Sequence, residues 1–237
     1  MKLAHIALEN PIDFKNDKIV FWNIEDTQIY YEFVRELKNQ IDGEDGNFVL
    51  SNNMKSLKFD SDAEIIVGPF DMAFDSKKIA NLISKRIIKT AIEDEYFVKF
   101  QNIEKSIMEY LKNLIIDADL PVEVEPLEIE NLIKASSFKA SESNSFYDNL
   151  INYVSLLLNL SKPQLLILVD IKRYIKQDFF AEFLSFLQYE DVNVLFIDCS
   201  LNKFSNNSAR TYFLDEDHCE FEYPIGYDFN CDQSIDI

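Results

Sequence analysis

The sequence lacks a glycine-rich phosphate-binding loop. Such a loop needs glycines, so that backbone N–H groups can surround the phosphates, followed by Lys and Ser or Thr. Only four glycines occur among the 237 residues, and none of them is followed by Lys-Ser or Lys-Thr. The sequence therefore gives no positive sign of an ATPase or a kinase.

Histidine and cysteine are also scarce, which bears on catalysis and metal binding. His5 lies near the N-terminus and His218 stands next to Cys219, so neither a Ser-His-Asp nor a Cys-His arrangement has a credible site. The three cysteines are an odd number without a C-x-x-C spacing, which supports neither a disulfide framework nor a zinc site. We identify no catalytic residue and expect a protein that is not an enzyme.

Long apolar runs are missing as well. Charged and polar residues interrupt the apolar part of the N-terminal stretch, so it cannot be the core of a signal peptide. No window approaches the roughly 18 uninterrupted apolar residues of a membrane span. We therefore expect a cytoplasmic protein without membrane contact.

Basic residues are few for the size of the chain. Lys and Arg number 23 against 42 Asp and Glu, which gives a net charge of −19. This charge repels phosphate backbones over most of the surface and favours solubility. Nucleic-acid binding would therefore need a part of the surface that is locally basic. Apolar residues, by contrast, make up 47% of the chain, which is enough to fill a core.

Short runs of β-branched and aromatic residues predict strands near both ends of the chain. The first 70 residues read β, α, β, β, beginning with a strand over 18–24. The runs 164–170 and 192–198 enclose a helical segment, which is the spacing of a βαβ unit with buried parallel strands. From about 75 to 161, helical spacing dominates.

The simplest assembly is an α/β domain built from both ends of the chain, with helices inserted between them. The predicted boundaries are 1–72 and 160–223 for the α/β domain, 73–159 for the inserted helical domain and 224–237 for a tail.

Both C-terminal strands end in an aspartate, Asp170 and Asp198. An apolar strand ending in Asp is typical of the magnesium side of an ATPase, but without a phosphate-binding loop nothing would hold a triphosphate. We favour the reading that both are strand-end residues of the scaffold. A divergent nucleotide-dependent kinase, using both around magnesium, is the alternative.

One segment, residues 76–92, departs from the acidic character of the chain. It carries five basic residues and no acidic one. On a helix, Lys78, Lys85 and Lys89 fall within about 40° of one another, while isoleucines form a separate apolar stripe. Such a basic ridge suits phosphate contacts, and it is also the pattern of a solvated helix face.

The opposite anomaly lies at residues 117–130, which contain six carboxylates, two prolines and no basic residue. Calcium takes about six to eight oxygen ligands, and carboxylates crowded together repel one another without a counter-ion. The segment therefore indicates either a calcium site or a solvated acidic turn. It does not follow the EF-hand pattern.

The order of the elements resembles that of a known family. A β-α-β start, a helical segment containing "LIKASSFKA", the runs "KPQLLILVD" and "VNVLFID" and a closing "ARTYFLDEDHCEF" are similar to the ring-forming spacer-acquisition proteins of type II-A CRISPR systems, the Csn family of CRISPR-associated proteins. The likeness covers about residues 1–222. It implies a degenerate nucleotide-kinase-like α/β head without a phosphate loop, and an inserted all-α leg domain.

The resemblance also implies a function. It implies a calcium-stabilised homotetrameric ring that binds double-stranded DNA, preferentially at free ends and without sequence preference, and that assists the CRISPR integrase and the effector nuclease complex in spacer acquisition. The DNA-binding residues it implies are Lys134 and Lys139 and, more loosely matched, Lys78, Lys85 and Lys89. The calcium ligands it implies, near the hinge between head and leg, are Asp119, Glu123, Glu125 and Glu128. An acidic calcium-binding interaction module without nucleic acid is a further alternative.

Overall fold

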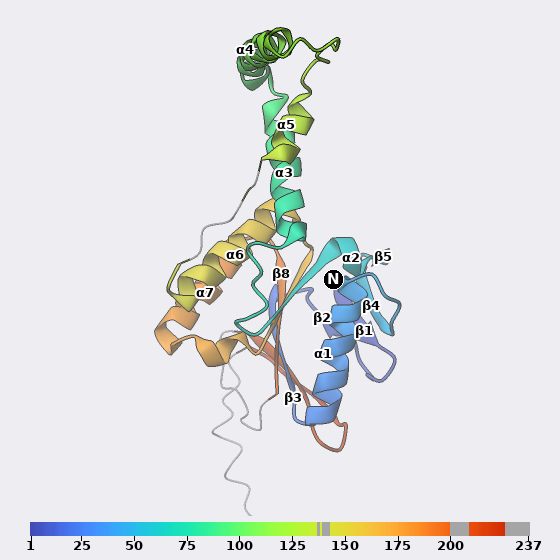
Figure 1. Ribbon diagram of the computed structural model, residues 1–237. Helices are drawn as coiled ribbons and strands as arrows, with labels where there is room; N and C mark the ends of the chain where they lie inside the picture. The colour runs from blue at the N-terminus through green and yellow to red at the C-terminus, as the bar shows by residue number, and fades with distance from the viewer. Residues whose placement is uncertain (137, 139–142, 200–208, 226–237) are drawn as a thin grey trace, which may run out of the picture. The chain divides into compact units, whose positions relative to one another are not determined.

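Figure 1 shows the computed structural model, which describes residues 1–136, 138, 143–199 and 209–225. The chain divides into two compact units. The first unit joins Met1–Met72 with Ser143–Ile237, and the second unit is Ala73–Glu142. Sheets and helices make up the first unit, whereas the regular structure of the described part of the second unit is helical. The protein is therefore mixed α/β.

The main sheet of the first unit draws its strands from both ends of the chain. The strands are β3 (Ile19–Ile24), β6 (Ala63–Val67), β7 (Leu165–Val169), β8 (Asn193–Asp198), β9 (Arg210–Leu214) and β10 (Glu220–Tyr223). Their order across the sheet is β10-β9-β3-β8-β7-β6, and all neighbours are parallel except β9 and β10. The predicted βαβ unit is confirmed, because β7 and β8 are adjacent and parallel.

Both faces of the main sheet are covered, which explains the uninterrupted apolar runs of its central strands. On one face, Trp22 of β3 stacks on Phe33 of helix α1 (Thr27–Ile41), with ring centroids 5.4 Å apart. On the other face, Phe196 of β8 contacts Phe180 of helix α7 (Gln177–Tyr189) at 5.5 Å. Figure 1 shows α1 and α7 on opposite sides of the strands. The carboxyl ends of the strands are thus held rigidly.

Helix α6 (Phe146–Leu160) belongs to the first unit by its contacts. Its Tyr147 ring stacks on Phe179 of α7, with centroids 4.9 Å apart. The boundaries predicted from the sequence group this helix with the inserted segment, because its helical spacing continues the pattern of the preceding helices. Two short helical turns complete the unit, α2 (Phe59–Asp62) and η1 (Ile171–Tyr174).

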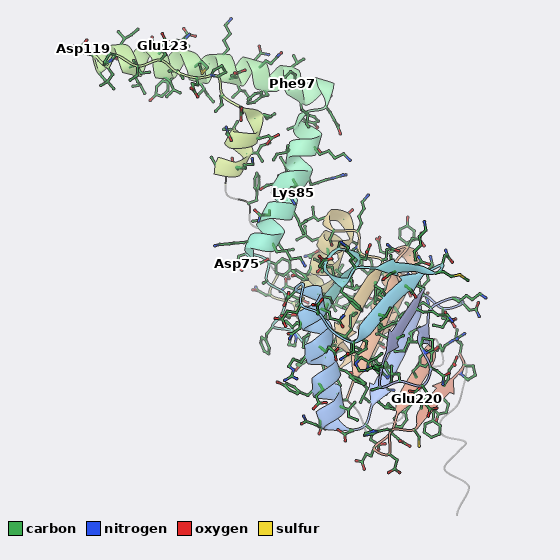
Figure 2. All side chains as sticks on the ribbon, turned by 90° about the vertical axis from the view of Figure 1, so that its right-hand side faces the viewer. Asp75, Lys85, Phe97, Asp119, Glu123 and Glu220 are labelled. Atoms are coloured by element: carbon green, nitrogen blue, oxygen red, sulfur yellow. The ribbon has the colours of Figure 1, made fainter. Side chains whose placement is uncertain are left out.

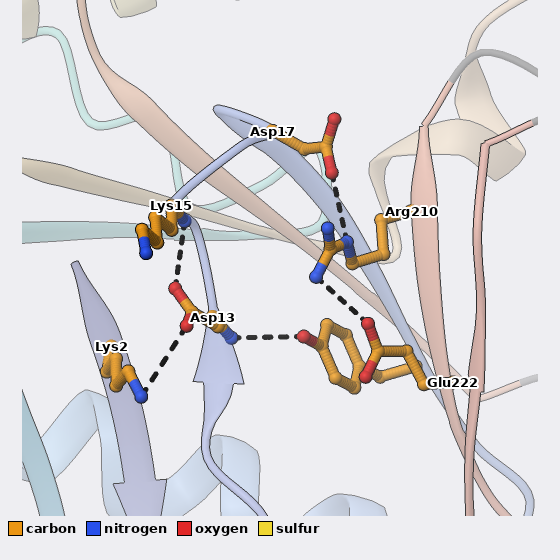
Figure 3. A network of polar contacts seen from close by, with 7 residues as sticks. Lys2, Asp13, Lys15, Asp17, Arg210 and Glu222 are labelled. Carbon is orange, nitrogen blue, oxygen red and sulfur yellow. Dashed lines mark hydrogen bonds and ion pairs between the residues drawn. The ribbon is translucent and has the colours of Figure 1, made fainter.

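A smaller antiparallel sheet with the order β2-β1-β4-β5 completes the core of the first unit. Its strands are β1 (Lys2–His5), β2 (Ile12–Asp13), β4 (Phe48–Asn52) and β5 (Lys55–Leu57). Figure 3 shows the polar contacts around the β9–β10 hairpin. The Tyr212 hydroxyl of β9 accepts from the backbone N–H of Asp13 in β2 at 3.1 Å, which joins the two sheets. Arg210 of β9 donates to Asp17, which precedes β3, and to Glu222 of β10, each at 2.9 Å. Strand β2, from the N-terminal part of the chain, and strand β9, from its C-terminal part, therefore hold the two sheets together.

The second unit contains helices α3 (Lys77–Ala91), α4 (Asp94–Asp117) and α5 (Ile129–Ala135). The hydroxyl of Ser76 caps α3 by accepting from the Ile79 N–H at 3.2 Å. Helix α5 packs along α3, and α4 turns away at the end of α3 (Figure 2). Among the helices that the structure describes, none combines the length and the apolar character of a membrane span.

Candidate nucleic-acid interface and the carboxyl edge of the sheet

The predicted basic ridge lies on α3. Lys78, Lys85 and Lys89 are exposed, whereas Ile79 on the apolar stripe is 1% exposed. Figure 2 shows the Lys85 side chain directed away from the helix axis. Helix α3 itself contains no carboxylate. The amphipathic pattern thus places the basic side chains on the outer face of this helix.

Lys134 lies on α5, next to α3 within the second unit. Its ammonium is 3.4 Å from the Glu130 carboxylate one helical turn earlier, with both side chains more than half exposed. Such an exposed pair contributes little stability, so it holds Lys134 only weakly. The unit therefore brings together the helices that carry four of the predicted DNA-binding lysines. Lys139 lies outside the described residues.

The predicted calcium ligands lie between α4 and α5, where the backbone has no regular structure. Asp119, Glu123, Glu125 and Glu128 are all exposed, and Glu128 accepts from the Asn131 side-chain amide at 2.9 Å. Within the described ranges, no group of three or more His, Cys, Asp or Glu side chains is placed to hold a metal ion. These four carboxylates therefore do not form a calcium ligand group within one chain.

Polar residues gather where the central strands of the main sheet end. Asn23 of β3 is paired in register with Asp198 of β8, and Asp170 follows β7 directly after the pair Val169–Ile197. Paired residues on neighbouring strands point to the same face, so Asn23 and Asp198 lie side by side. Asp170, with a left-handed φ of 55°, lies in the turn after β7 and its charge acts on Asp198. We call these three residues the polar row. Asn23 is 1% exposed and Asp198 is 2% exposed. The row is therefore a polar site inside the edge of an apolar sheet.

Three neighbouring side chains surround this row. The Tyr30 hydroxyl of α1 donates a hydrogen bond to Asp170 Oδ2, and the Arg173 guanidinium lies 3.2 Å from Asp170 Oδ1. Burial, and then the charge of Asp170, raise the pKa of Asp198 to about 7. Burial, followed by the hydrogen bond to Asp170, raises the pKa of Tyr30, and burial lowers the pKa of Lys172. Tyr30 therefore remains a hydrogen-bond donor at neutral pH.

The start of α1 lies beside this edge, and two of its backbone N–H groups are hydrogen-bonded within the chain. Only Glu25 and Asp26 separate β3 from α1. The Asp26 carboxylate accepts from the backbone N–H groups of Gln28 at 2.7 Å and Ile29 at 2.9 Å. Free N–H groups at a helix start are what bind phosphate in nucleotide sites. In this chain a side chain already occupies them, which argues against a nucleotide-dependent kinase.

Sequence reasoning identified Asp170 and Asp198 but missed Asn23 and Tyr30. Asn23 is the one polar residue in the otherwise apolar strand "IVFWNI", and this interruption was the available signal. Tyr30 carries no comparable signal, because its role depends on the packing of α1 against the sheet.

The chain matches the model of a known protein family. No curated protein sequence matches the chain. The family model described as "CRISPR-associated protein (Cas_Csn2)" matches residues 40–218, which include the basic helix, the acidic segment and most of the main sheet. This match spans well over half of the 237 residues. The chain therefore belongs to the Csn2 family of CRISPR-associated proteins.

Proposed function

We propose that the protein forms a homotetrameric ring that binds double-stranded DNA, preferentially at free ends and without sequence preference. In this proposal it assists the CRISPR integrase and the effector nuclease complex during spacer acquisition and catalyses no reaction itself. The observation that carries the proposal is the exposed basic face of α3, a helix without carboxylates in a chain of net charge −19. The family membership supports the CRISPR context.

Electrostatics favours binding through this face. An acidic surface repels DNA in most orientations, so a confined basic face becomes the one approach with an attractive potential. Lysine ammonium groups contact phosphates, which are the same for every base sequence. Binding through Lys85, Lys89 and Lys134 would therefore be insensitive to sequence and sensitive to salt.

The exposed apolar side chains of α4 support self-association. Among them are Ile103 at 51%, Tyr110 at 63% and Leu114 at 46% exposure. A shallow groove between turns of this helix is lined by Asn102, Ile103, Ser106, Ile107 and Tyr110. Among the described side chains of this helix only Phe100 is buried, so an apolar face of this length fits contact with other copies of the chain.

In the same proposal the first unit is a degenerate nucleotide-kinase-like head and the second unit is an inserted all-α leg. The mostly parallel sheet supports the relation to nucleotide-binding folds. The Asp26 cap at the start of α1 supports the loss of nucleotide binding. The head would then act as a scaffold.

Calcium binding remains a prediction from the family likeness, since the four candidate carboxylates do not form a ligand group within one chain among the described residues. Calorimetric titration of the whole chain with calcium chloride tests it. We expect Glu123→Gln together with Glu125→Gln to weaken calcium binding at least about tenfold, since each removes a charged oxygen ligand. Unchanged affinity would exclude both residues as ligands.

The experiment that tests the function compares binding to linear duplex DNA and to covalently closed circles of the same sequence, at fixed salt with calcium. Strong binding to the linear form alone is the result expected of a closed ring that DNA enters through its ends. Equal binding to both forms contradicts entry through ends. Binding to neither would overturn the DNA-binding function and favour an acidic interaction module.

A further inference from the structure

The Asn23 side chain at the carboxyl edge of the main sheet is buried without a hydrogen-bond partner. It is 1% exposed, and among the described residues neither its amide nitrogen nor its amide oxygen has a partner. Buried polar groups in native proteins are nearly always hydrogen-bonded, because an unsatisfied one costs folding free energy. A buried, unsatisfied amide therefore indicates a ligand, an ion or a water molecule at this position.

Two carboxylate oxygens in the same row share this property. Asp198 Oδ1 and Asp170 Oδ1 are buried and have no hydrogen-bond partner among the described residues. Arg173 forms an ion pair with Asp170 Oδ1 at 3.2 Å and also donates to the Cys199 carbonyl, so the charge of Asp170 is partly compensated. The second oxygen of Asp170 already accepts from Tyr30. Three oxygens without a hydrogen bond among the described residues thus lie at the carboxyl ends of β3, β8 and β7, one each from Asn23, Asp198 and Asp170, and that of Asp170 is ion-paired with Arg173.

The spacing of these strands suits a small cation. Neighbouring strands are about 4.8 Å apart, so side-chain oxygens from adjacent strands can approach one ion placed over the middle strand. That strand is β8, with Asp198 between Asn23 and Asp170. Carboxylate and amide oxygens are ligands for hard divalent cations.

We propose that Asn23, Asp170 and Asp198 bind a hard divalent cation, with Mg²⁺ as the favoured ion, at the carboxyl edge of the main sheet and without any nucleotide. Magnesium is favoured over calcium because it uses one or two carboxylates and keeps several waters, whereas calcium takes more protein oxygens. The ion joins the ends of β3, β7 and β8 and relieves the repulsion between the two aspartates. This site is separate from the acidic segment at 117–130.

Two neighbouring basic side chains set the strength of binding. Lys172 and Arg173 both interact electrostatically with Asp198, so they already neutralise part of the negative charge. Binding is therefore weak. We expect a dissociation constant for the cation of roughly 0.1–1 mM, near the weak end of the range for oxygen-ligand sites. A lone water molecule is the competing occupant, since it would also satisfy the amide.

The test measures cation binding by the full chain with magnesium chloride in thermal unfolding and with Mn²⁺ as a paramagnetic probe. Variants with Glu123→Gln and Glu125→Gln serve as the background, so that the acidic segment contributes little. We expect Mg²⁺ to raise the Tm of this background protein by several degrees. Asn23→Val and Asp198→Asn should each abolish the Mg²⁺-dependent rise and weaken Mn²⁺ binding at least tenfold.

Asn23→Asp provides a second test of cation binding, which does not depend on the folding of Asn23→Val or Asp198→Asn. A third carboxylate in the row should lower the Tm in chelator and enlarge the rise produced by Mg²⁺. If a water molecule is the occupant, Asn23→Asp should lower the Tm without recovery in Mg²⁺, and the background protein should show no Mg²⁺-dependent rise. Either of these results, or Mn²⁺ binding that survives both Asn23→Val and Asp198→Asn, overturns the proposal.

Discussion

At the scale of single residues, Asp26 determines what the start of α1 can bind. Its carboxylate accepts from two backbone N–H groups of the first helical turn. An anionic cap also interacts favourably with the positive end of the helix dipole. The same contacts that stabilise α1 therefore remove its N-terminus as a phosphate site.

We expect Asp26→Ala to lower the free energy of unfolding by about 1 kcal/mol, because it deletes this cap. Asp26→Ser is the matched control, since a serine hydroxyl can accept from the same N–H groups and should restore most of the loss. Urea denaturation followed by circular dichroism measures both. Equal losses in the two variants would mean that the cap is not the source of the stability.

Arg210 connects the start of β9 to two separate acidic side chains, and its side chain is only 20% exposed. We expect Arg210→Met to lower the free energy of unfolding by about 1–3 kcal/mol, because it removes charged hydrogen bonds in a partly buried position. Lys18→Met is the control. Its pair with Asp191 has side chains 53% and 90% exposed, so the expected change is within about 0.5 kcal/mol. Similar losses for both variants in urea denaturation would contradict the burial argument.

At the scale of elements, the second unit differs from the first in how it uses apolar residues. The strands β7 and β8 bury their apolar residues within the chain. Helix α4 keeps most of its apolar stripe exposed in the described structure, although it is the longest helix. Exposed apolar surface of this kind marks a site of association.

We expect Ile103→Glu together with Leu114→Glu to convert the proposed homotetramer to smaller species, because two buried charges per copy would oppose association through α4. Asn113→Glu, on an exposed polar position of the same helix, is the matched control and should leave the mass unchanged. Light scattering after size exclusion measures the mass, and circular dichroism verifies that the helices persist. A double variant with the mass of the unmodified protein would exclude α4 as the interface.

A sequence pattern predicted the structure correctly where only one kind of structure produces that pattern. Long buried runs such as those of β7 and β8 could be assigned, because only parallel strands with both faces covered require them. The strands β1, β2 and β5 were missed, since each has at most four residues and too short an alternation to recognise. The helical period of α4 predicted an apolar face, but a period does not say what covers that face.

The two candidate sites also differ in how far the sequence predicts them. The basic face of α3 follows from the helical period and local composition, both of which the sequence contains. The row of Asn23, Asp198 and Asp170 follows from the register of β3 against β8, and residues so far apart in sequence acquire a common position only through the sheet topology. Register between distant parallel strands is set by packing of the whole core, so a single sequence does not determine it.

At the scale of the whole molecule, the charge distribution predicts how the proposed DNA affinity responds to salt. We expect Lys85→Gln together with Lys89→Gln to weaken binding to all duplex sequences alike. The slope of log K against log salt should fall in magnitude by about 0.9 for each phosphate that the variant no longer neutralises. Titrations of labelled duplex from low to moderate salt measure this slope.

Lys15→Gln together with Lys55→Gln is the charge-matched control, because both lysines are exposed in the first unit and lie outside the basic helix. The control should change neither the slope nor the affinity appreciably. A control that weakens binding as much as the α3 variant would indicate that overall charge, rather than the α3 face, governs DNA binding.

The position of β3 between β8 and β9 has a consequence for how the protein is synthesised. β3 leaves the ribosome well before either neighbour in the sheet, because residues 25–192 separate it from β8 and β9 follows later still. The nascent chain must therefore hold Val20, Phe21 and Trp22, all 2% exposed or less in the final fold, without their partners until β8 and β9 have been synthesised. The high sequence separation of these pairings makes the sheet slow to close and exposes it to aggregation meanwhile. A chain released before β9 would leave β3 as an apolar edge strand, which can pair with other chains.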